Sequence, residues 1–296
     1  MQQQDTQRQT QNHSQKEMRT QIITLYCLCD DFLRARRWRD DPQAKMSTAE
    51  VMTVSLVAAA LFDGNQEKSR RFLKEHGYIK TMLSKSRFNR RRYAIPEVLW
   101  QGLLWLLGEA AKLANPEGVY AVDSVPIPVC DNIRIRRCRL YPCHNKGKQD
   151  RPEDPHWGYC ASKRRYYYGL KGHLLVTAAG QPVEFALTPA AIVGFRKLDL
   201  DLPAGAIVNA DAAYTDYDYE GLLRQMEQVD LLADRKRNSL RQHPACLSYL
   251  CQHFRKRIET TFSTVTQWLG RRLHAVTLEE WESKVFLTVL AYAILP

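Results

Sequence analysis

Three acidic residues lie where an enzyme could use them to hold a divalent cation. Asp123 ends the apolar run Tyr-Ala-Val, Asp211 ends Ile-Val-Asn-Ala, and Glu259 follows Arg-Lys-Arg-Ile. A carboxylate at the end of a buried strand costs desolvation free energy unless a cation compensates it. Three hard oxygen ligands with no fixed His or Cys favour Mg²⁺ over zinc. Two such ions, about 3.5 to 4 Å apart, can activate a hydroxyl and stabilise the leaving oxygen of a phosphodiester.

Each of these acids also has a simpler interpretation. A lone Asp at a strand end is more often a turn or capping residue than a ligand, and Glu259 alone would be a surface charge of a helix. The three together, at the places where one fold needs them, favour the metal site. The neighbouring acids Asp216, Asp218 and Glu220 suit helix capping and the helix dipole instead.

The elements expected around the acids form an α/β fold. After the loop signal at residues 115–118, the apolar periodicity changes from helical to strand-like. We expect strands over 119–129, 166–178, 182–188, 206–210 and 229–233, and helices over 195–200, 217–228, 247–269 and 278–295. This order resembles that of an RNase H-like mixed sheet flanked by helices. That fold places one acid in its first strand, one after its fourth strand and one on its last helix.

The preceding part of the chain is expected to be helical. Apolar residues recur at helical spacing over 22–33, 48–62, 68–76 and 96–113, whereas the Gln-rich residues 1–20 have few apolar side chains to bury. We therefore predict a disordered Gln-rich leader at 1–20 and an all-helical N-terminal DNA-binding domain at 21–114. The RNase H-like catalytic domain then covers 115–296, with a basic insertion at about 131–165.

The charge of the chain favours a polyanionic partner. Its 43 Lys and Arg residues against 32 Asp and Glu residues give a formal net charge of +11, which suits nucleic acid. No window is long and apolar enough for a transmembrane helix, and the N-terminus lacks the apolar core of a secretory signal. We expect a cytoplasmic, nucleoid-associated protein that does not bind a membrane. Cys138, Cys143, His144 and Cys160 lack the paired spacing of a structural zinc site, so we interpret them as ordinary thiols.

Basic side chains gather in segments that we expect to contact DNA phosphates. Residues 68–92 carry ten Lys and Arg against Glu75 alone, and residues 133–171 carry eleven against three acids. A solvated helix face or loop is the alternative, but so one-sided an excess favours DNA. The candidate DNA-binding residues are Lys85, Arg87, Arg90, Arg91, Arg92, Arg134, Arg136, Arg137, Lys163, Arg164, Arg165, Arg235, Lys236 and Arg237. Trp157 and Tyr159 are candidates for stacking on an unpaired base near the cut.

Five short motifs follow one another along the chain. They are Asp123-Ser-x-Pro-x-Pro-x-Cys130, Tyr168-Gly-x-Lys-x-His-Leu174, Gly180-x-Pro-Val-x-Phe-x-Leu-Thr-Pro-Ala190, Asp211-Ala-Ala-Tyr214 and Arg255-x-x-x-Glu259. Each motif is weak alone, whereas the five in this order are specific. Over residues 22–295 the chain resembles bacterial insertion-sequence transposases of the DDE class, and most closely the IS-nine-eight-two type.

The resemblance implies recognition of terminal inverted repeats, strand cleavage by water, and attack of the freed 3′-hydroxyl on target DNA at one Mg²⁺ site, where Mn²⁺ can substitute. It makes Asp123, Asp211 and Glu259 the catalytic metal ligands. The residues expected to lie behind these ligands or to contact DNA are Lys171, His173, Tyr214 and Arg255. The implied partner is double-stranded DNA, and we expect a homodimer on DNA because two element ends must be held together.

Two departures from the family pattern leave alternatives open. Many relatives carry a His-Asp pair where this chain has Val193-Gly194, and a Lys where this chain has Thr266. A transposase-derived DNA-binding protein without catalytic activity is therefore one alternative. An RNase H-like nuclease that uses the same acids only for hydrolysis is the other.

Overall fold

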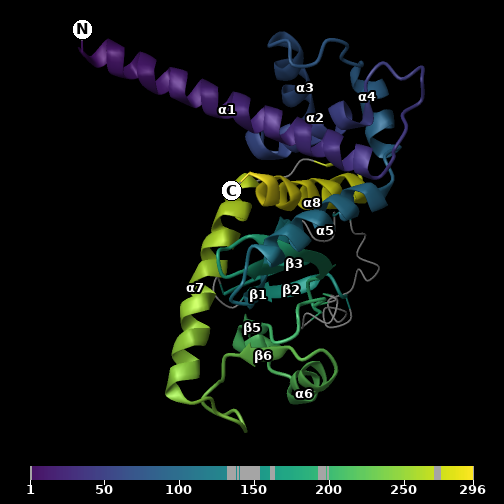
Figure 1. Ribbon diagram of the computed structural model, residues 1–296. Coiled ribbons are helices and arrows are strands. Elements are labelled where there is room, and N and C mark those ends of the chain that lie inside the picture. The colour runs from purple at the N-terminus through teal and green to yellow at the C-terminus, as the bar shows by residue number, and fades with distance from the viewer. Residues whose placement is uncertain are drawn as a thin grey trace. The chain divides into compact units, whose positions relative to one another are not determined.

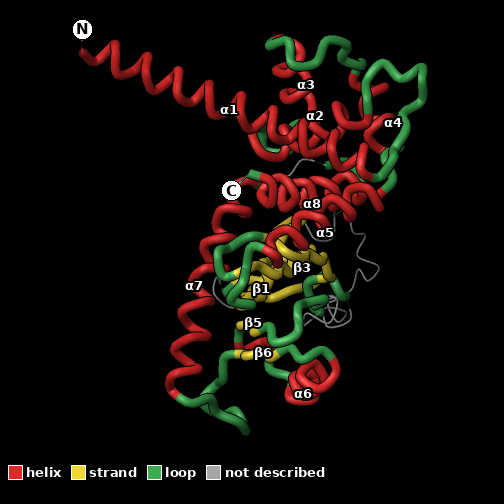
Figure 2. The backbone as a smooth tube through the Cα atoms, in the orientation of Figure 1, coloured by secondary structure: helices red, strands yellow, loops and turns green. Residues whose placement is uncertain are grey.

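The computed structural model describes residues 2–131, 138, 140, 154–160, 164–192, 198, 200–269 and 275–295. The chain divides into two compact units (Figures 1 and 2). The first comprises Met1–Leu103, Trp268–Arg271 and Lys284–Pro296, and the second comprises Leu104–Gln267 and Arg272–Ser283. The predicted helix at 195–200 and most of the predicted basic insertion lie outside the described residues. Across the described ranges, no helix is long and apolar enough to cross a membrane.

The first unit is built around a buried helix. Its elements are α1 (Gln2–Ala35), α2 (Thr48–Leu61), α3 (Gln66–Glu75), α4 (Lys85–Tyr93), the beginning of α5 (Glu97–Leu113) and most of α8 (Leu278–Ile294). A capping box starts α2: Ser47 Oγ accepts from Glu50 N, and Glu50 Oε2 accepts from Ser47 N. The run from Val51 to Ala59 is buried on every side, so α2 forms the centre against which α1, α3 and α4 pack.

Two helices of this unit differ from the sequence-based expectation. Helix α1 begins at Gln2, where a disordered leader was predicted, and Gln, Arg and Lys are good helix formers. Among the side chains of α1 whose burial is described, Ile22 is the first that is buried, and residues 13, 15–17, 19 and 20 are exposed. Helix α4 was not predicted, because its sequence holds a single buried apolar side chain, Phe88.

The second unit contains a mixed six-stranded sheet flanked by helices. Its strands are β1 (Val119–Asp131), β2 (Trp157–Cys160), β3 (Arg165–Thr177), β4 (Pro182–Pro189), β5 (Ile207–Ala210) and β6 (Asp230–Ala233). They run in the order β2-β3-β1-β5-β6, with β4 also paired to β3. β1 is antiparallel to β3 and parallel to β5, and β5 is parallel to β6. Five strands match the predicted ones closely, and β2 is additional.

Helices follow the last two strands. After β5 come η2 (Ala212–Tyr214) and α6 (Tyr217–Met226), and after β6 come α7 (Ala245–Trp268) and α8 (Leu278–Ile294). Asp216 caps α6, as expected, by accepting from Tyr219 N at 3.2 Å. Helix α7 contacts β6 and the loop between β3 and β4 through two of its buried residues. The Sγ of Cys251 contacts the carbonyl oxygen of Leu232 at 3.6 Å, and the hydroxyl of Thr261 donates to Gly180 O at 3.3 Å.

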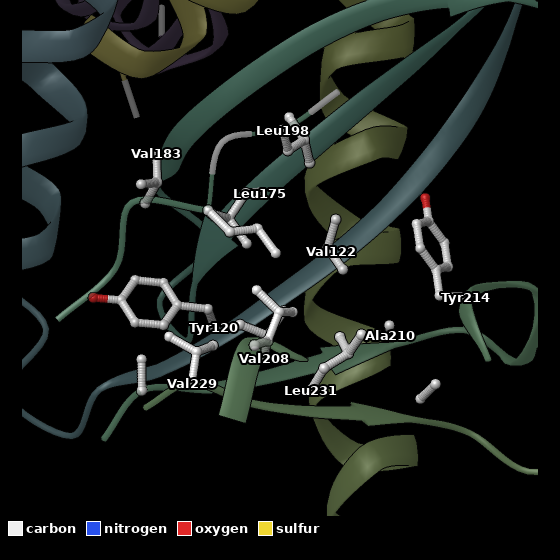
Figure 3. Close-up of a cluster of buried hydrophobic side chains, with 14 residues drawn as sticks. Tyr120, Val122, Leu175, Val183, Leu198, Val208, Ala210, Tyr214, Val229 and Leu231 are labelled. Carbon is white, nitrogen blue, oxygen red and sulfur yellow. The ribbon is translucent and has the colours of Figure 1, made fainter. Parts of the chain in front are cut away.

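The core of this unit lies on one face of the sheet (Figure 3). Val122, Leu175, Val208 and Leu231 come from four strands, and Leu223 of α6 packs against them. Because side chains alternate along a strand, the residues next to these project from the opposite face. Helix α6 therefore packs on the face that carries this cluster, and Figure 3 shows α7 behind the sheet, on the opposite side.

Candidate active site

Strand register brings two of the predicted acids together. Val122 of β1 pairs in parallel with Ala210 of β5. The next residues are Asp123 and Asp211, and the backbone of Asp211 remains extended (φ −70°, ψ 160°). Asp123 and Asp211 thus each directly follow the last residue pair of the parallel ladder, in which adjacent backbones lie about 4.8 Å apart. Asp123 lies within β1, and by alternation its side chain projects from the face opposite Val122. Asp211 directly follows β5 and is the N-cap of η2.

Both carboxylates are held by the backbone that follows them. Asp123 Oδ1 accepts from Ser124 N at 2.7 Å, and Asp211 Oδ1 accepts from Ala212 N at 2.6 Å. Each Asp is half-buried. Neighbouring like charges destabilise each other unless a cation or proton lies between them. The chemistry of the donor set, hard carboxylate oxygens from neighbouring strands, fits a divalent cation such as Mg²⁺.

A buried polar chain lies behind the Asp pair. His173 Nε2 is 2.9 Å from Thr188 Oγ1, and His173 Nδ1 is 3.3 Å from the hydroxyl of Tyr214. The Tyr214 hydroxyl is also hydrogen bonded to the side chain of Ser124, which stands opposite His173 in the β1–β3 register. The hydroxyl of Thr188 donates to Pro189 O at 3.4 Å, which leaves it free to accept from His173 Nε2–H. These hydrogen-bonded side chains therefore link β1, β3, β4 and η2, the elements that carry or flank both Asp residues.

The protonation states in this chain follow from burial. Burial lowers the pKa of His173 to about 4, and the positive charge of Lys171 acts in the same direction, so the imidazole is neutral at pH 7. Burial also raises the pKa of Tyr214 above its ordinary value. The hydrogen bond from Ser124 opposes this rise, and the negative charges of Asp123 and Asp211 add to it. These charge effects show that Tyr214 lies close to both acids, at the end of the core cluster opposite Tyr120 (Figure 3).

Glu259 lies on α7 and its side chain is exposed. The buried stripe of this helix includes Cys251, Ile258, Phe262 and Val265, and Glu259 stands on the flank of that stripe. Within the described ranges, no three His, Cys, Asp or Glu side chains are close enough together to hold a metal ion. The register thus brings the backbones of Asp123 and Asp211 near each other, and α7 carries Glu259.

Other expected site residues take varied positions. Lys171 is half-buried, burial lowers its pKa, and its Nζ donates to Ile192 O at 3.4 Å. Arg255 lies one turn before Glu259 on α7. Val193 and Gly194 lie outside the described residues, and Thr266 donates its hydroxyl to Phe262 O within α7. The sequence analysis gave Ser124 and Thr188 no role. Their side chains are connected through hydrogen bonds of His173 and Tyr214, and these hydrogen bonds join residues that are far apart in the sequence.

Comparison with known proteins assigns the family. A family model described as the transposase DDE domain matches residues 114–294, which is more than half of the chain. The chain belongs to the transposase DDE domain family. No curated protein and no solved structure matches it. The family identifies an enzyme of the nuclease or transposase type whose partner is DNA, and the Asp pair, Tyr214, His173 and Glu259 all lie within the matched residues.

The basic residues expected to bind the DNA of this transposase divide into exposed and engaged groups. On α4, Lys85, Arg87 and Arg90 are exposed. Arg91 instead pairs with Asp40 at 2.6 Å, and Arg92 is 5% exposed, with its guanidinium 4.5 Å from the ring centroid of Tyr93. Arg91 and Arg92 therefore stabilise the helical unit.

The same division holds in the transposase DDE domain. Arg235 makes two hydrogen bonds to Glu220, at 2.8 and 2.5 Å, and its guanidinium lies 5.0 Å from the ring centroid of Tyr217. Its neighbours Lys236 and Arg237 are exposed, as are Arg164 and Arg165 near the β2–β3 turn. Arg134, Arg136, Arg137 and Lys163 lie outside the described residues.

Proposed function

We propose that this protein is an insertion-sequence transposase, of the IS-nine-eight-two type, that binds terminal inverted repeats and catalyses metal-dependent DNA cleavage and strand transfer. The observation that carries the proposal is the parallel pairing of Val122 with Ala210, which places Asp123 of β1 and Asp211 after β5 next to the same residue pair, in a chain of the transposase DDE domain family. A lone Asp has a structural explanation, whereas two acids that follow one residue pair of neighbouring strands favour a shared cation.

Asp123, Asp211 and Glu259 are the proposed ligands of two Mg²⁺ ions, with Mn²⁺ as a substitute. When bound, the ions supply activation of the attacking hydroxyl and charge stabilisation at the leaving oxygen. The protein contributes the fixed positions of the two Asp residues and the buried chain from Ser124 to Thr188 behind them. Glu259 is proposed to approach from α7 once a cation offsets the mutual repulsion of the three carboxylates.

The order of elements in the second unit supports an RNase H-like fold for the catalytic domain. Asp123 lies in the first strand of this unit, Asp211 directly follows β5, and α7 carries the third acid. We further propose that the helical N-terminal domain at 21–114 binds DNA through Lys85, Arg87 and Arg90. The exposed Lys236, Arg237, Arg164 and Arg165 would extend this binding over the catalytic domain, with a homodimer holding two ends.

Cleavage of labelled DNA that carries the element's terminal repeats tests the proposal. Asp123→Asn, Asp211→Asn and Glu259→Gln should each lower Mg²⁺-dependent nicking at the repeat boundary by about a thousandfold or more, because each removes a ligand to the ions. Asp218→Asn and Glu279→Gln are matched controls, since both acids are exposed on other helices. These two variants should cleave at the rate of the unmodified protein.

The same assay separates the alternatives. Nicking followed by joining of the 3′ end to a second DNA supports a transposase, whereas nicking without joining supports a nuclease. Specific binding without any nicking would identify a DNA-binding protein that has lost catalysis. Nicking that survives substitution of one acid would remove that acid from the proposed site.

A further inference from the structure

The β2–β3 pair carries a row of aromatic side chains on one face. In the antiparallel register Tyr159 lies opposite Tyr166, and Trp157 lies opposite Tyr168. The ring centroids are 4.9 Å apart for Tyr159 and Tyr166, 6.4 Å for Trp157 and Tyr166, and 6.3 Å for Trp157 and Tyr168. Because alternate residues of a strand share a face, the four rings form one continuous row.

One end of the row is anchored and the other is open. Tyr168 is fully buried, and its hydroxyl donates to Asp154 Oδ2 at 2.9 Å. Tyr159 and Tyr166 are 52% and 48% exposed. Packing between the strands therefore accounts for the burial of Tyr168, whereas about half of the Tyr159 ring and of the Tyr166 ring stays in solvent. Large rings held at this exposure are typical of surfaces that bind a partner.

The opposite face of the hairpin is closed. Gly158 lies so near the ring of Tyr167 that an added Cβ would be 2.6 Å from it and 2.7 Å from the Cβ of Ala190. Cys160, Tyr167 and Ala190 form a small buried cluster there. The β2–β3 pair is thus fixed from one side, and this support holds the exposed rings of the other side in place.

Positive charge accompanies the exposed rings. Arg164 and Arg165 precede Tyr166 in the chain, and both are exposed. Arg165 pairs with Cys160, so it projects from the closed face, and Arg164 is the basic residue next to β3 at the open end of the row. Asp154, the acid at the other end of the row, is already engaged by Tyr168 and by His156 N. Aromatic rings near an exposed guanidinium group complement the bases and phosphates of nucleic acid.

We propose that Tyr159 and Tyr166, with Arg164, form a stacking site for unpaired nucleotides of DNA. The site rests on the proposed function, in which DNA is the substrate. Each base presents a flat π face to an aromatic ring, so the site binds single strands of any sequence, and Arg164 contacts the backbone.

The strand register gives the distance of this site from the Asp pair. Asp123 pairs with Leu174, which follows Tyr166 by eight residues along β3. Eight residues of a strand span about 26 Å. The stacking site therefore holds nucleotides that flank the cut, some distance along the strand, and this replaces the expectation of stacking next to the cut.

Binding of a labelled single-stranded oligonucleotide to the full chain tests the site, with the same sequence as a blunt duplex for comparison. All proteins carry Asp123→Asn and the buffer lacks Mg²⁺, so that cleavage plays no part. Tyr159→Leu with Tyr166→Leu should weaken single-strand binding about fivefold or more for each ring and leave duplex binding unchanged. Tyr159→Phe with Tyr166→Phe should retain single-strand binding, because the rings remain. Tyr249→Leu, which removes a 68% exposed ring on α7, is the matched control and should change neither.

The outcomes distinguish this site from the proposed function. If the double Leu variant binds the single strand as well as the protein with both Tyr residues does, the stacking site is wrong and duplex binding still supports a transposase. If the protein with both Tyr residues binds neither DNA, the stacking site and the proposed function are both overturned. A Leu variant that turns a dimer into a monomer, measured by sedimentation, with single-strand affinity intact, would make this face a contact between two copies and overturn the stacking site. Equal loss in the Phe variant would also overturn it.

Discussion

At the residue scale, His173 shows how a buried polar side chain can make stability depend on pH. It is 1% exposed and bonded on both ring nitrogens, to Tyr214 and Thr188. A protonated imidazole would need both partners to accept, yet the Thr188 hydroxyl and Tyr214 hydroxyl accommodate a neutral ring with its proton on Nε2. Protonation therefore disrupts the chain behind the Asp pair.

We predict that His173 makes the folded protein less stable as the pH falls below neutrality. Its pKa is about 4 in the folded protein and about 6.5 in the unfolded chain, so the unfolded chain binds the proton more tightly. Stability is complete above pH 6.5, falls as the pH drops through that range, and stops falling below about pH 4. Between pH 6.5 and pH 5 the loss should be about 2 kcal/mol.

Urea unfolding at pH 7 and pH 5 measures this loss. The variant His173→Gln should be less stable at pH 7 but should lose about 2 kcal/mol less than the unmodified protein on going to pH 5. His253→Gln, in which an exposed His of α7 is replaced, should keep the original pH dependence. An unchanged pH dependence in His173→Gln would show that the imidazole is not held neutral.

Asp123 and Asp211 are candidates from the sequence because each directly follows an apolar run, and their role stays a prediction. The buried hydrogen-bonded side chains behind them could not be predicted from the sequence. His173 and Thr188 are 15 residues apart and His173 and Tyr214 are 41 apart, so only the assembled sheet brings them together. The exposed or engaged state of each arginine likewise depends on neighbours that local sequence does not specify.

At the element scale, the segment after β6 combines an internal ion pair with exposed charge. Arg235 and Glu220 have side chains that are 5% and 13% exposed, and they join this segment to α6. Lys236 and Arg237, the next two residues, are exposed. One short basic run therefore has two different roles.

We expect substitutions in this run to separate stability from DNA binding. Arg235→Gln should destabilise the fold by about 3 to 5 kcal/mol, because it leaves the Glu220 carboxylate buried without its partner. Lys236→Gln with Arg237→Gln should leave stability within about 0.5 kcal/mol and weaken DNA binding. Thermal unfolding and DNA titration of both variants test this expectation. If Arg235→Gln and the double variant destabilised the fold equally, the expectation would be wrong.

The elements that sequence reasoning missed are those with few apolar residues. Strand β2 has four residues and α4 is mainly basic, so neither shows a clear apolar period. Strands β3 to β6 and helices α5 to α8 were found within a few residues, because each buries a regular apolar face. Both missed elements carry exposed side chains with a proposed role in DNA binding: Tyr159 on β2, and Arg87 and Arg90 on α4.

At the scale of the whole molecule, the net charge of +11 favours a polyanion, and the exposed basic residues occur in both compact units. Neutralised phosphates release counterions, so the DNA affinity should fall steeply with salt. The slope of log affinity against log salt concentration gives the number of phosphate contacts, whichever residues make them.

Replacing Lys85, Arg87 and Arg90 of α4 together by Gln tests their part in this slope. The plot of log affinity against log salt concentration should become shallower by about two to three, because each phosphate contact contributes about 0.9. Arg34→Gln is the control, since Arg34 is 75% exposed on α1 but paired with Asp30. A triple variant with an unchanged slope would exclude α4 from the DNA contact.

The parallel pairing of β1 with β5 has a consequence for synthesis of the chain. Asp211 follows Asp123 by 88 residues. At a ribosomal rate of about 5 to 20 residues per second, the second Asp emerges about 4 to 18 seconds after the first. The antiparallel partner β3 emerges earlier, so one edge of β1 is covered while the edge that awaits β5 stays open. During those seconds the nascent protein can hold neither the cation nor the closed sheet, and its open edge is the place where a chaperone or a second nascent chain would bind.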